Sequence, residues 1–327
     1  MKKGALCITS IAFVLALLIA PFNCIRAQFC CVEQRSQLDS ITPVLVENSI
    51  VTTTLDKYLA DKILMTLQPY SDRSVPDLMI MAAKMLIGTP YVAGTLDKTA
   101  PNEQLTINLH QTDCIIFVET CLNLAITAHR SGKKATFQQF AENERVSRYR
   151  NGTIGSYSSR LHYTTEWIRQ GEKFGNIKDI TMNLGGEIYY HPIFFMSHNY
   201  QRYKQLSSAE ELSRITEIEN NLNKMPITYI PKEKIAECED KICSGDIICY
   251  MSATPGLDIA HVTIACVENG RVGFIHASFA DMKVELDKMT IKEYVNSRKS
   301  ITGIKVIRPT SDVNVNKYLL EALNHNK

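Results

Sequence analysis

The segment from Cys114 to Ala128, CIIFVETCLNLAITA, limits the possible folds of this chain more than any other feature. Its spacing predicts a helix. Thr112 or Asp113 can cap the first turn, because a short polar side chain accepts a hydrogen bond from a free backbone N–H. The helix is apolar on most of its sides, and such a helix is usually buried at the centre of a domain.

Four short runs rich in β-branched residues predict strands in the last third of the chain. They cover residues 246–251, 261–268, 271–278 and 303–308. Two earlier segments, 56–67 and 75–86, have the apolar spacing of helices. We therefore expect an α+β fold in which the buried helix packs on an antiparallel sheet.

Asn269-Gly270 joins two of the predicted strands and is a strong hairpin signal, since both residues tolerate the positive φ of a type I′ turn. Counting outward from this turn pairs Thr263 with His276. Residues two apart along a strand share a face, so His261 lies on the same face as His276. Diagonal positions of this kind are roughly 7–8 Å apart, within reach of aromatic side chains. The hairpin thus predicts two neighbouring imidazoles.

The charge balance excludes one class of partner. The 327 residues carry 36 basic and 34 acidic side chains, a formal net charge of +2, and no long basic run indicates a nucleic-acid partner. We expect residues 28–327 to form one domain. Residues from about 133 to 234 are aromatic-rich and lack the low complexity of a linker, which indicates an insertion that packs on the core and shapes the substrate site.

The N-terminus has the pattern of a secretory signal. Lys2 and Lys3 precede an apolar run from Ile11 to Ala20, which is shorter than the roughly 20 residues of a membrane span. We expect residues 1–27 to be removed, leaving an exported protein, periplasmic or secreted, without stable membrane insertion. An uncleaved anchor is an open alternative. A lipoprotein is another, modified at a cysteine near the cleavage site.

The ten cysteines include no C-x-x-C pair, which argues against a zinc knuckle or a thioredoxin-type motif. Export would permit disulfides, and Cys238 with Cys243 is the best local candidate. Cys121, Cys249 and Cys266 lie in apolar runs and are expected to be buried, inert thiols. No cluster has the spacing of metal ligands, so we expect neither a metal nor a cofactor.

Cys114 is the candidate nucleophile. At the first turn of a helix, free N–H groups and the helix dipole favour a thiolate and can hold an oxyanion. On position alone, a core cysteine near a helix start is an equal alternative. His261 and His276 favour catalysis, because two imidazoles on one face suit a general base and the group that orients it.

Five motifs occur in a characteristic order: GTPYVAGT, TDCIIFVE, SGDIICY, AHVTIAC and FIHAS. Together they resemble the NlpC-type cell-wall cysteine peptidases, which have a papain-like fold and a Cys–His–polar triad. INLHQTDCIIFVETCLNLA, SRLHYTTEWI, LGG and FMS resemble more closely the N-acetylmuramoyl-L-alanine amidase-like branch of that superfamily. The resemblance covers most of the chain after the signal, from about residue 77 to 308.

The resemblance implies a role for each matching residue. Cys114 matches the nucleophile, His261 the general base and His276 the residue that orients the base. Tyr91 matches a tyrosine that faces the cleft. Asp113 precedes the nucleophile and is expected to bind substrate or cap the helix.

Other residues are less settled by the sequence. Ile115 and Ile116 follow the nucleophile where the wider family usually has a small polar residue, which makes this rim apolar. Arg160 and Tyr163 suit a carboxylate and a sugar ring and are expected to bind substrate, with a solvated amphipathic helix as the alternative. Glu119 lies in the apolar helix and needs a partner if it is buried.

The resemblance implies a reaction and a substrate. The branch hydrolyses the amide bond between the lactyl group of N-acetylmuramic acid and L-alanine, favouring peptidoglycan fragments with anhydro-muramic ends. One alternative is an endopeptidase that cleaves between D-glutamate and the diamino acid of the stem peptide. Another is a non-catalytic wall-binding homologue, which would be marked by loss of the cysteine or of a histidine. All three residues are present.

Overall fold

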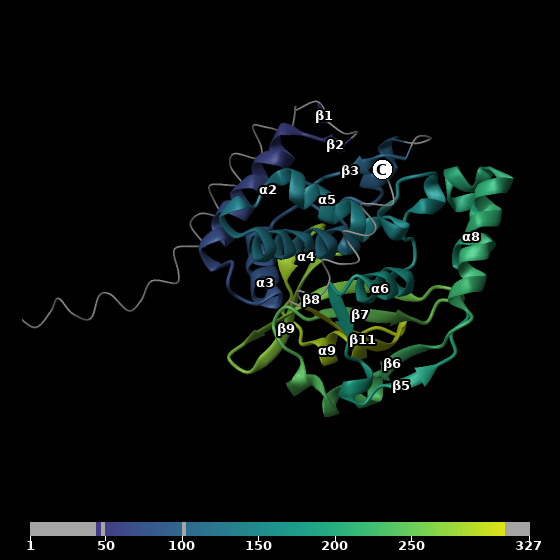
Figure 1. The fold of residues 1–327 in the computed structure, drawn as a ribbon. Coiled ribbons are helices and arrows are strands. Elements are labelled where there is room, and N and C mark those ends of the chain that lie inside the picture. The colour runs from purple at the N-terminus through teal and green to yellow at the C-terminus, as the bar shows by residue number, and fades with distance from the viewer. Residues whose placement is uncertain (1–43, 47–49, 100–102, 311–327) are drawn as a thin grey trace, which may run out of the picture. The chain divides into compact units, whose positions relative to one another are not determined.

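The computed structural model describes residues 44–46, 50–99 and 103–310 (Figure 1). All of them belong to one compact unit. The signal predicted for residues 1–27 lies outside the described residues. Within the described ranges, no helix combines the length and the apolar character that a membrane span requires.

Helix α4 (Cys114–Ser131) lies in a helical layer, and every residue from Ile116 to Ala128 is buried, as the apolar sequence predicts. The layer covers one side of the main sheet (Figure 1), and α4 contacts strand β8 of that sheet. The two helices predicted upstream are confirmed to within two residues at each end. The helices packed against α4 are α2 (Thr54–Leu67), α3 (Val75–Met85) and α5 (Phe137–Arg148).

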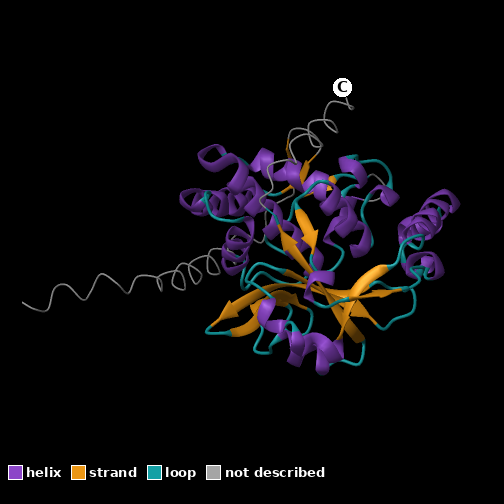
Figure 2. Cartoon of the chain, turned by 60° about the horizontal axis from the view of Figure 1, so that its bottom comes forward, coloured by secondary structure: helices purple, strands orange, loops and turns teal. Residues whose placement is uncertain are grey.

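An antiparallel sheet forms the second layer (Figure 2). The four predicted strands are confirmed as β7, β8, β9 and β11. Strand β4 (Ile177–Asp179) pairs with β11 beside the main path of the sheet. In spatial order the other strands are β10 (Lys283–Leu286), β9 (Arg271–Ser278), β8 (Ile259–Glu268), β7 (Ile247–Ser252), β11 (Ile301–Pro309), β6 (Ile227–Pro231) and β5 (Glu187–Tyr189).

Strands β4, β5 and β6 come from the middle region, where the sequence pattern predicts no strand. Each is only three to five residues long, too short for a clear alternating pattern. The middle region therefore extends the main sheet as well as packing on the core. Besides α5, this region contains the α-helices α6 (Thr164–Lys173), α7 (Phe195–His198) and α8 (Ala209–Leu222).

The hairpin between β8 and β9 has the predicted turn and register. Asn269 and Gly270 have φ values of 53° and 76°, which a type I′ turn requires. Glu268 pairs with Arg271, and the same register continues to Ile264 with Ile275. His261 and His276 consequently lie on the same face of the sheet.

Two smaller elements complete the unit. Strands β1 (Val44–Val46), β2 (Ile50–Thr52) and β3 (Leu105–Thr106) form a separate sheet in which β2 and β3 are parallel. Helix α9 (Ile291–Asn296) lies on the side of the main sheet away from α4 (Figure 1). Its Tyr294 and Val295 join a buried cluster with Tyr250 and Phe274 of the sheet.

The burial predicted for three cysteines is confirmed, whereas the candidate disulfide is not. Cys121, Cys249 and Cys266 are buried, as predicted. The candidate disulfide between Cys238 and Cys243 is not formed in the structure, where both thiols are free. Cys238 is buried and donates to the Ile235 carbonyl, whereas Cys243 is exposed and donates to the Lys241 carbonyl.

Candidate active site

Cys114 is the first residue of α4, and its side chain is half-buried. Asp113 is the N-cap, because its carboxylate accepts a hydrogen bond from the Ile116 backbone N–H at 3.0 Å. The backbone N–H groups of Ile115 and Val262 are directed at the Cys114 sulfur and favour its thiolate form. The nucleophile candidate therefore lies where the start of α4 meets strand β8.

The two predicted histidines are in direct contact. His261 Nε2 lies 2.8 Å from His276 Nδ1, and the rings meet edge to face with centroids 5.1 Å apart. The rings of Tyr250, Phe274 and Tyr294 surround the pair. This aromatic surrounding fixes the orientation of both imidazoles.

Asp287, which the sequence analysis missed, extends this row of polar groups. Its carboxylate lies 3.3 Å from His276 Nε2, and its backbone N–H donates to the Phe274 carbonyl. Asp287 follows strand β10, in which Glu285 pairs with His276. Finding it from sequence would require the path of the chain between β9 and β10, which no local motif gives.

Cys114, His261 and His276 line one cavity of about 460 Å³. We call it the larger cavity. Three side chains complete much of its wall: Tyr91, Tyr294 and Arg298. The structure thus brings together four of the seven residues singled out in the sequence.

Tyr91 reaches this cavity because its segment is held on two sides. Its backbone N–H donates to the Met282 carbonyl, and Val92 donates to the Thr112 carbonyl just before the helix. The Tyr91 ring meets Phe279 edge to face, with centroids 5.6 Å apart. Burial raises the pKa of Tyr91 to about 12, so its hydroxyl stays protonated and can donate.

The electrostatics differ from the low thiol pKa expected at a helix start. Burial raises the pKa of Cys114 to about 12, and the Asp113 carboxylate adds to the rise; the nearby N–H groups only offset part of it. Burial, His276 and Arg298 lower the pKa of His261 to about 3. Burial also lowers the pKa of His276 to about 4, although Asp287 acts against it. Thiol and imidazoles are therefore neutral near pH 7.

A second cavity, of about 230 Å³, opens beside the same helix start. We call it the smaller cavity. Its lining includes Asp113, Ile115, Glu119, Arg148, Arg160 and Trp167. Asp113 and Ile115 flank Cys114 in the chain, so Cys114 lies between the two cavities.

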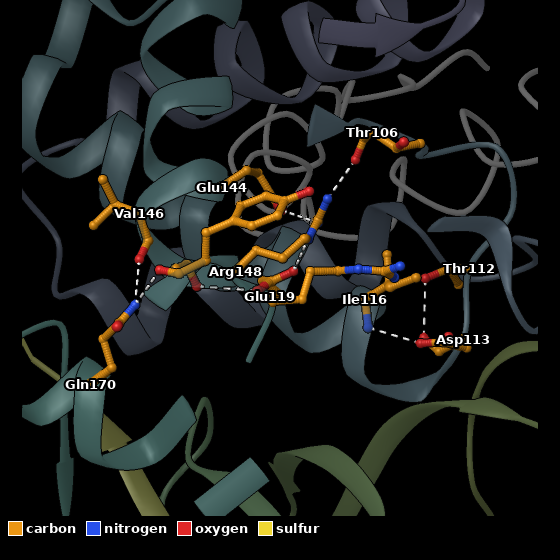
Figure 3. A network of polar contacts seen from close by, with 12 residues as sticks. Thr106, Thr112, Asp113, Ile116, Glu119, Glu144, Val146, Arg148 and Gln170 are labelled. Carbon is orange, nitrogen blue, oxygen red and sulfur yellow. Dashed lines mark hydrogen bonds and ion pairs between the residues drawn. The ribbon is translucent and has the colours of Figure 1, made fainter. Parts of the chain in front are cut away.

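The charges of the smaller cavity are paired within the protein. Arg148 contacts Glu119 at 2.8 Å, Glu144 and the carbonyl of Thr106 (Figure 3). All four residues are buried. The partner expected for Glu119 is therefore Arg148, and the network joins α4 and α5 to β3.

Of the two middle-region residues predicted to bind substrate, Arg160 lines a cavity and Tyr163 does not. Arg160 lines the smaller cavity, but its guanidinium already pairs with Asp97 at 2.7 Å and Glu103 at 2.9 Å. Tyr163 is only 2% exposed, and its hydroxyl donates to Glu219 and accepts from the Met196 N–H. Tyr163 lines neither cavity, so its position is that of a core residue.

The described ranges contain no group of three or more His, Cys, Asp or Glu side chains arranged to hold a metal ion. The arrangement of a thiol, two linked imidazoles and helix N–H groups is chemically suited to acyl transfer.

Comparison with known proteins places the chain in a family. Residues 81–304 match the family described as AmiA-like, N-acetylmuramoyl-L-alanine amidase-like. A solved structure of an N-acetylmuramoyl-L-alanine amidase from Bacteroides uniformis is 34% identical, with a TM-score of 0.68 over 72% of this chain and 99% of that chain. A search of curated proteins found no match.

Two further structures are similar. One, from Bacteroides fragilis, is described as a putative xylanase; it is 35% identical, with a TM-score of 0.64 over 68% of this chain and 96% of that chain. A protein from Legionella pneumophila, 21% identical with a TM-score of 0.58 over 78% of this chain and 95% of that chain, shares the fold alone. Because the family match spans more than half of the sequence, this chain belongs to the N-acetylmuramoyl-L-alanine amidase-like family.

Proposed function

We propose that the protein hydrolyses the amide bond between the lactyl group of N-acetylmuramic acid and L-alanine in peptidoglycan fragments. The observation that carries the proposal is the position of Cys114, His261 and His276 in one cavity. Family membership supports the substrate class. We further propose an NlpC-type, papain-like arrangement and export by the N-terminal segment.

The tautomers in this mechanism follow from the carboxylate at the end of the row. The Asp287 carboxylate, 3.3 Å from Nε2 of His276, favours a proton on that nitrogen, so Nδ1 of His276 is left as an acceptor. That nitrogen accepts from the Nε2–H of His261 at 2.8 Å. The Nδ1 atom of His261 then carries a lone pair and can take the thiol proton.

Because Cys114 and His261 are both neutral before the reaction, the thiol proton must move during the attack. Because the pKa of Cys114 is raised and that of His261 is lowered, the thiol transfers its proton to His261 as it attacks the lactyl carbonyl. A carbon–sulfur bond forms, and backbone N–H groups at the helix start stabilise the oxyanion. His261 then gives the proton to the departing amine of L-alanine, and the carbon–nitrogen bond breaks.

The second half of the reaction frees the enzyme. Water attacks the thioester, His261 takes a proton from that water, and the Cys114 sulfur leaves and is reprotonated. His276, held by Asp287, keeps the ring of His261 in one orientation through both halves. In this scheme His276 and Asp287 are positioning residues, since neither touches the reacting atoms.

The two cavities suggest where the parts of the substrate bind. The leaving amine must reach His261, so the leaving peptide occupies the larger cavity. The muramic sugar then lies toward the smaller cavity, where Trp167 offers an aromatic ring and the paired Arg160 retains donor N–H groups. In this arrangement Asp113 shapes the wall between the two parts.

Digestion of defined muropeptides tests the proposal. Mass spectrometry after incubation with the wild type is expected to show free peptides that begin with L-alanine, and Cys114→Ala is expected to yield none. Release of an L-alanyl-D-glutamate dipeptide, or of a disaccharide that still carries it, would instead identify an endopeptidase. No cleavage by the wild type would leave a wall-binding protein.

A further inference from the structure

Arg298 is a charged residue of the larger cavity that the proposed mechanism does not use. It follows α9 and lines the cavity together with Cys114 and His261. Its guanidinium carbon lies 3.5 Å from the centroid of the Tyr294 ring, and its Nη1 donates to the Ser297 hydroxyl at 2.8 Å. This stacking holds the guanidinium beside the histidines.

The guanidinium of Arg298 has no protein counter-charge. Among the residues that the structure describes, none places a carboxylate within the 4.0 Å of an ion pair with it. Arg160 in the smaller cavity differs, since it pairs with Asp97 and Glu103. A half-buried cation without a counter-charge is unfavourable, and an anionic ligand would reduce that cost.

The histidines give an independent reason to expect an anion at this point. The charge of Arg298 lowers the pKa of both His261 and His276, which makes His261 a poorer proton acceptor. Asp287 and Asp281 act on His276 in the opposite direction. An anion paired with Arg298 would offset the contribution of its charge, although not that of burial, and would make His261 a better proton acceptor when substrate is present.

The substrate carries anionic groups on only one side of the amide bond that is cleaved. The carboxyl group of muramic acid is consumed in the amide bond, so every carboxylate of the substrate lies on the peptide that leaves. That peptide must also lie in the cavity of His261, which protonates its amine. Arg298 and the carboxylates of the leaving group are thus expected in the same cavity.

We propose that Arg298 binds a carboxylate of the leaving stem peptide. The inference rests on the proposed function and names the chemical group by which the site recognises its substrate. The planar guanidinium can form two parallel hydrogen bonds to a carboxylate, a geometry that a carboxamide does not match. The enzyme therefore discriminates acidic stem peptides from amidated ones.

The test compares N-acetylmuramoyl-L-alanyl-D-glutamate with its diamide, which has no negative charge. The wild type is expected to favour the acid by roughly tenfold to hundredfold in kcat/KM, the range of charge-assisted hydrogen bonds. Arg298→Gln is expected to bring this ratio near one by slowing hydrolysis of the acid. Lys299→Gln, which removes the charge of an exposed neighbour outside the cavity, should keep the wild-type ratio.

Each other outcome is decisive. An unchanged ratio in Arg298→Gln, or equal losses on both compounds, would overturn the inference. So would equal hydrolysis of the two compounds by the wild type, a result that needs no variant. Should Arg298→Gln not fold, Arg298→Lys retains the cation and is expected to keep a preference for the acid; loss of that preference would overturn the inference. Cleavage of neither compound by the wild type would overturn the proposed function itself.

Discussion

The two cavities at the start of α4 use charge in different ways. In the smaller cavity both arginines are paired: Arg148 with Glu119 and Glu144, and Arg160 with Asp97 and Glu103. In the larger cavity Arg298 stacks on Tyr294 beside two neutral histidines and has no carboxylate partner among the described residues. A charge network that is satisfied within the protein fixes shape, whereas an unpaired charge beside reacting groups is available to a ligand.

The largest effect is expected from the residue between the cavities. Cys114→Ala should fold normally and lose essentially all hydrolysis, because the covalent route requires the thiol. Product masses from a defined muropeptide provide the measurement. Cys243→Ala is the matched control, since Cys243 is exposed, lines neither cavity and should be dispensable. Turnover near the wild-type rate in Cys114→Ala would end the proposal.

A graded series is expected along the row of polar groups in the larger cavity. His261→Ala should lose about 10²–10⁴-fold in kcat/KM, the usual contribution of a general acid–base group. His276→Ala should lose less, and His276→Gln less still, because an amide oxygen can accept from the His261 ring. Asp287→Asn should have the smallest effect, since its contact is 3.3 Å long. Full activity in His276→Ala would contradict the relay.

In the smaller cavity the largest effect is expected on stability. Arg148→Met leaves Glu119 without its buried counter-charge and should lower the free energy of unfolding by about 3–5 kcal/mol. Arg145→Met is the control: it removes a more exposed arginine of α5 that pairs with Glu142, for which about 0–1 kcal/mol is expected. Urea unfolding measures both. If Arg148→Met is as stable as the wild type, the paired network does not stabilise the fold.

The electrostatics of the larger cavity predict an unusual pH profile for the thiol. With the pKa of Cys114 at about 12, the thiolate fraction and the alkylation rate should rise about tenfold per pH unit from 7 to 10. The experiment uses iodoacetamide in a Cys243→Ser background, because exposed Cys243 would otherwise react. A rate that levels off near neutral pH would instead indicate a preformed thiolate–imidazolium pair, as a helix start alone predicts.

Local patterns were sufficient to predict the positions of Cys114, His261 and His276 in the larger cavity. The positive φ values at Asn269 and Gly270 fix the hairpin register, and the register alone puts His261 and His276 on one face. The apolar sequence after Cys114 likewise predicts a buried helix with the cysteine at its start. These features depend on residues that are close in the chain, so they can be predicted from the sequence.

Features that depend on distant contacts could not be predicted in this way. Asp287 reaches His276 just after strand β10, and Arg298 reaches the larger cavity just after α9; neither lies in a recognisable motif. The raised pKa of Cys114 results from burial by the whole fold, which outweighs the local helix N–H groups. The exposure of Cys243 likewise depends on tertiary packing, so its spacing from Cys238 could not decide whether the two thiols pair.

The smallest effect is expected at Tyr163, for which the sequence predicts substrate binding and the structure shows a core position. Tyr163→Phe removes a buried hydroxyl that bonds to Glu219 and to the Met196 N–H, so it should lower the free energy of unfolding by about 1–3 kcal/mol and leave kcat/KM unchanged. Tyr58→Phe, at a tyrosine 51% exposed, should change neither quantity. A lower kcat/KM with unchanged stability would mean that Tyr163 contacts substrate, as the sequence suggested. The smaller cavity would then have to open further when substrate binds, and its paired charges could no longer be regarded as fixing its shape.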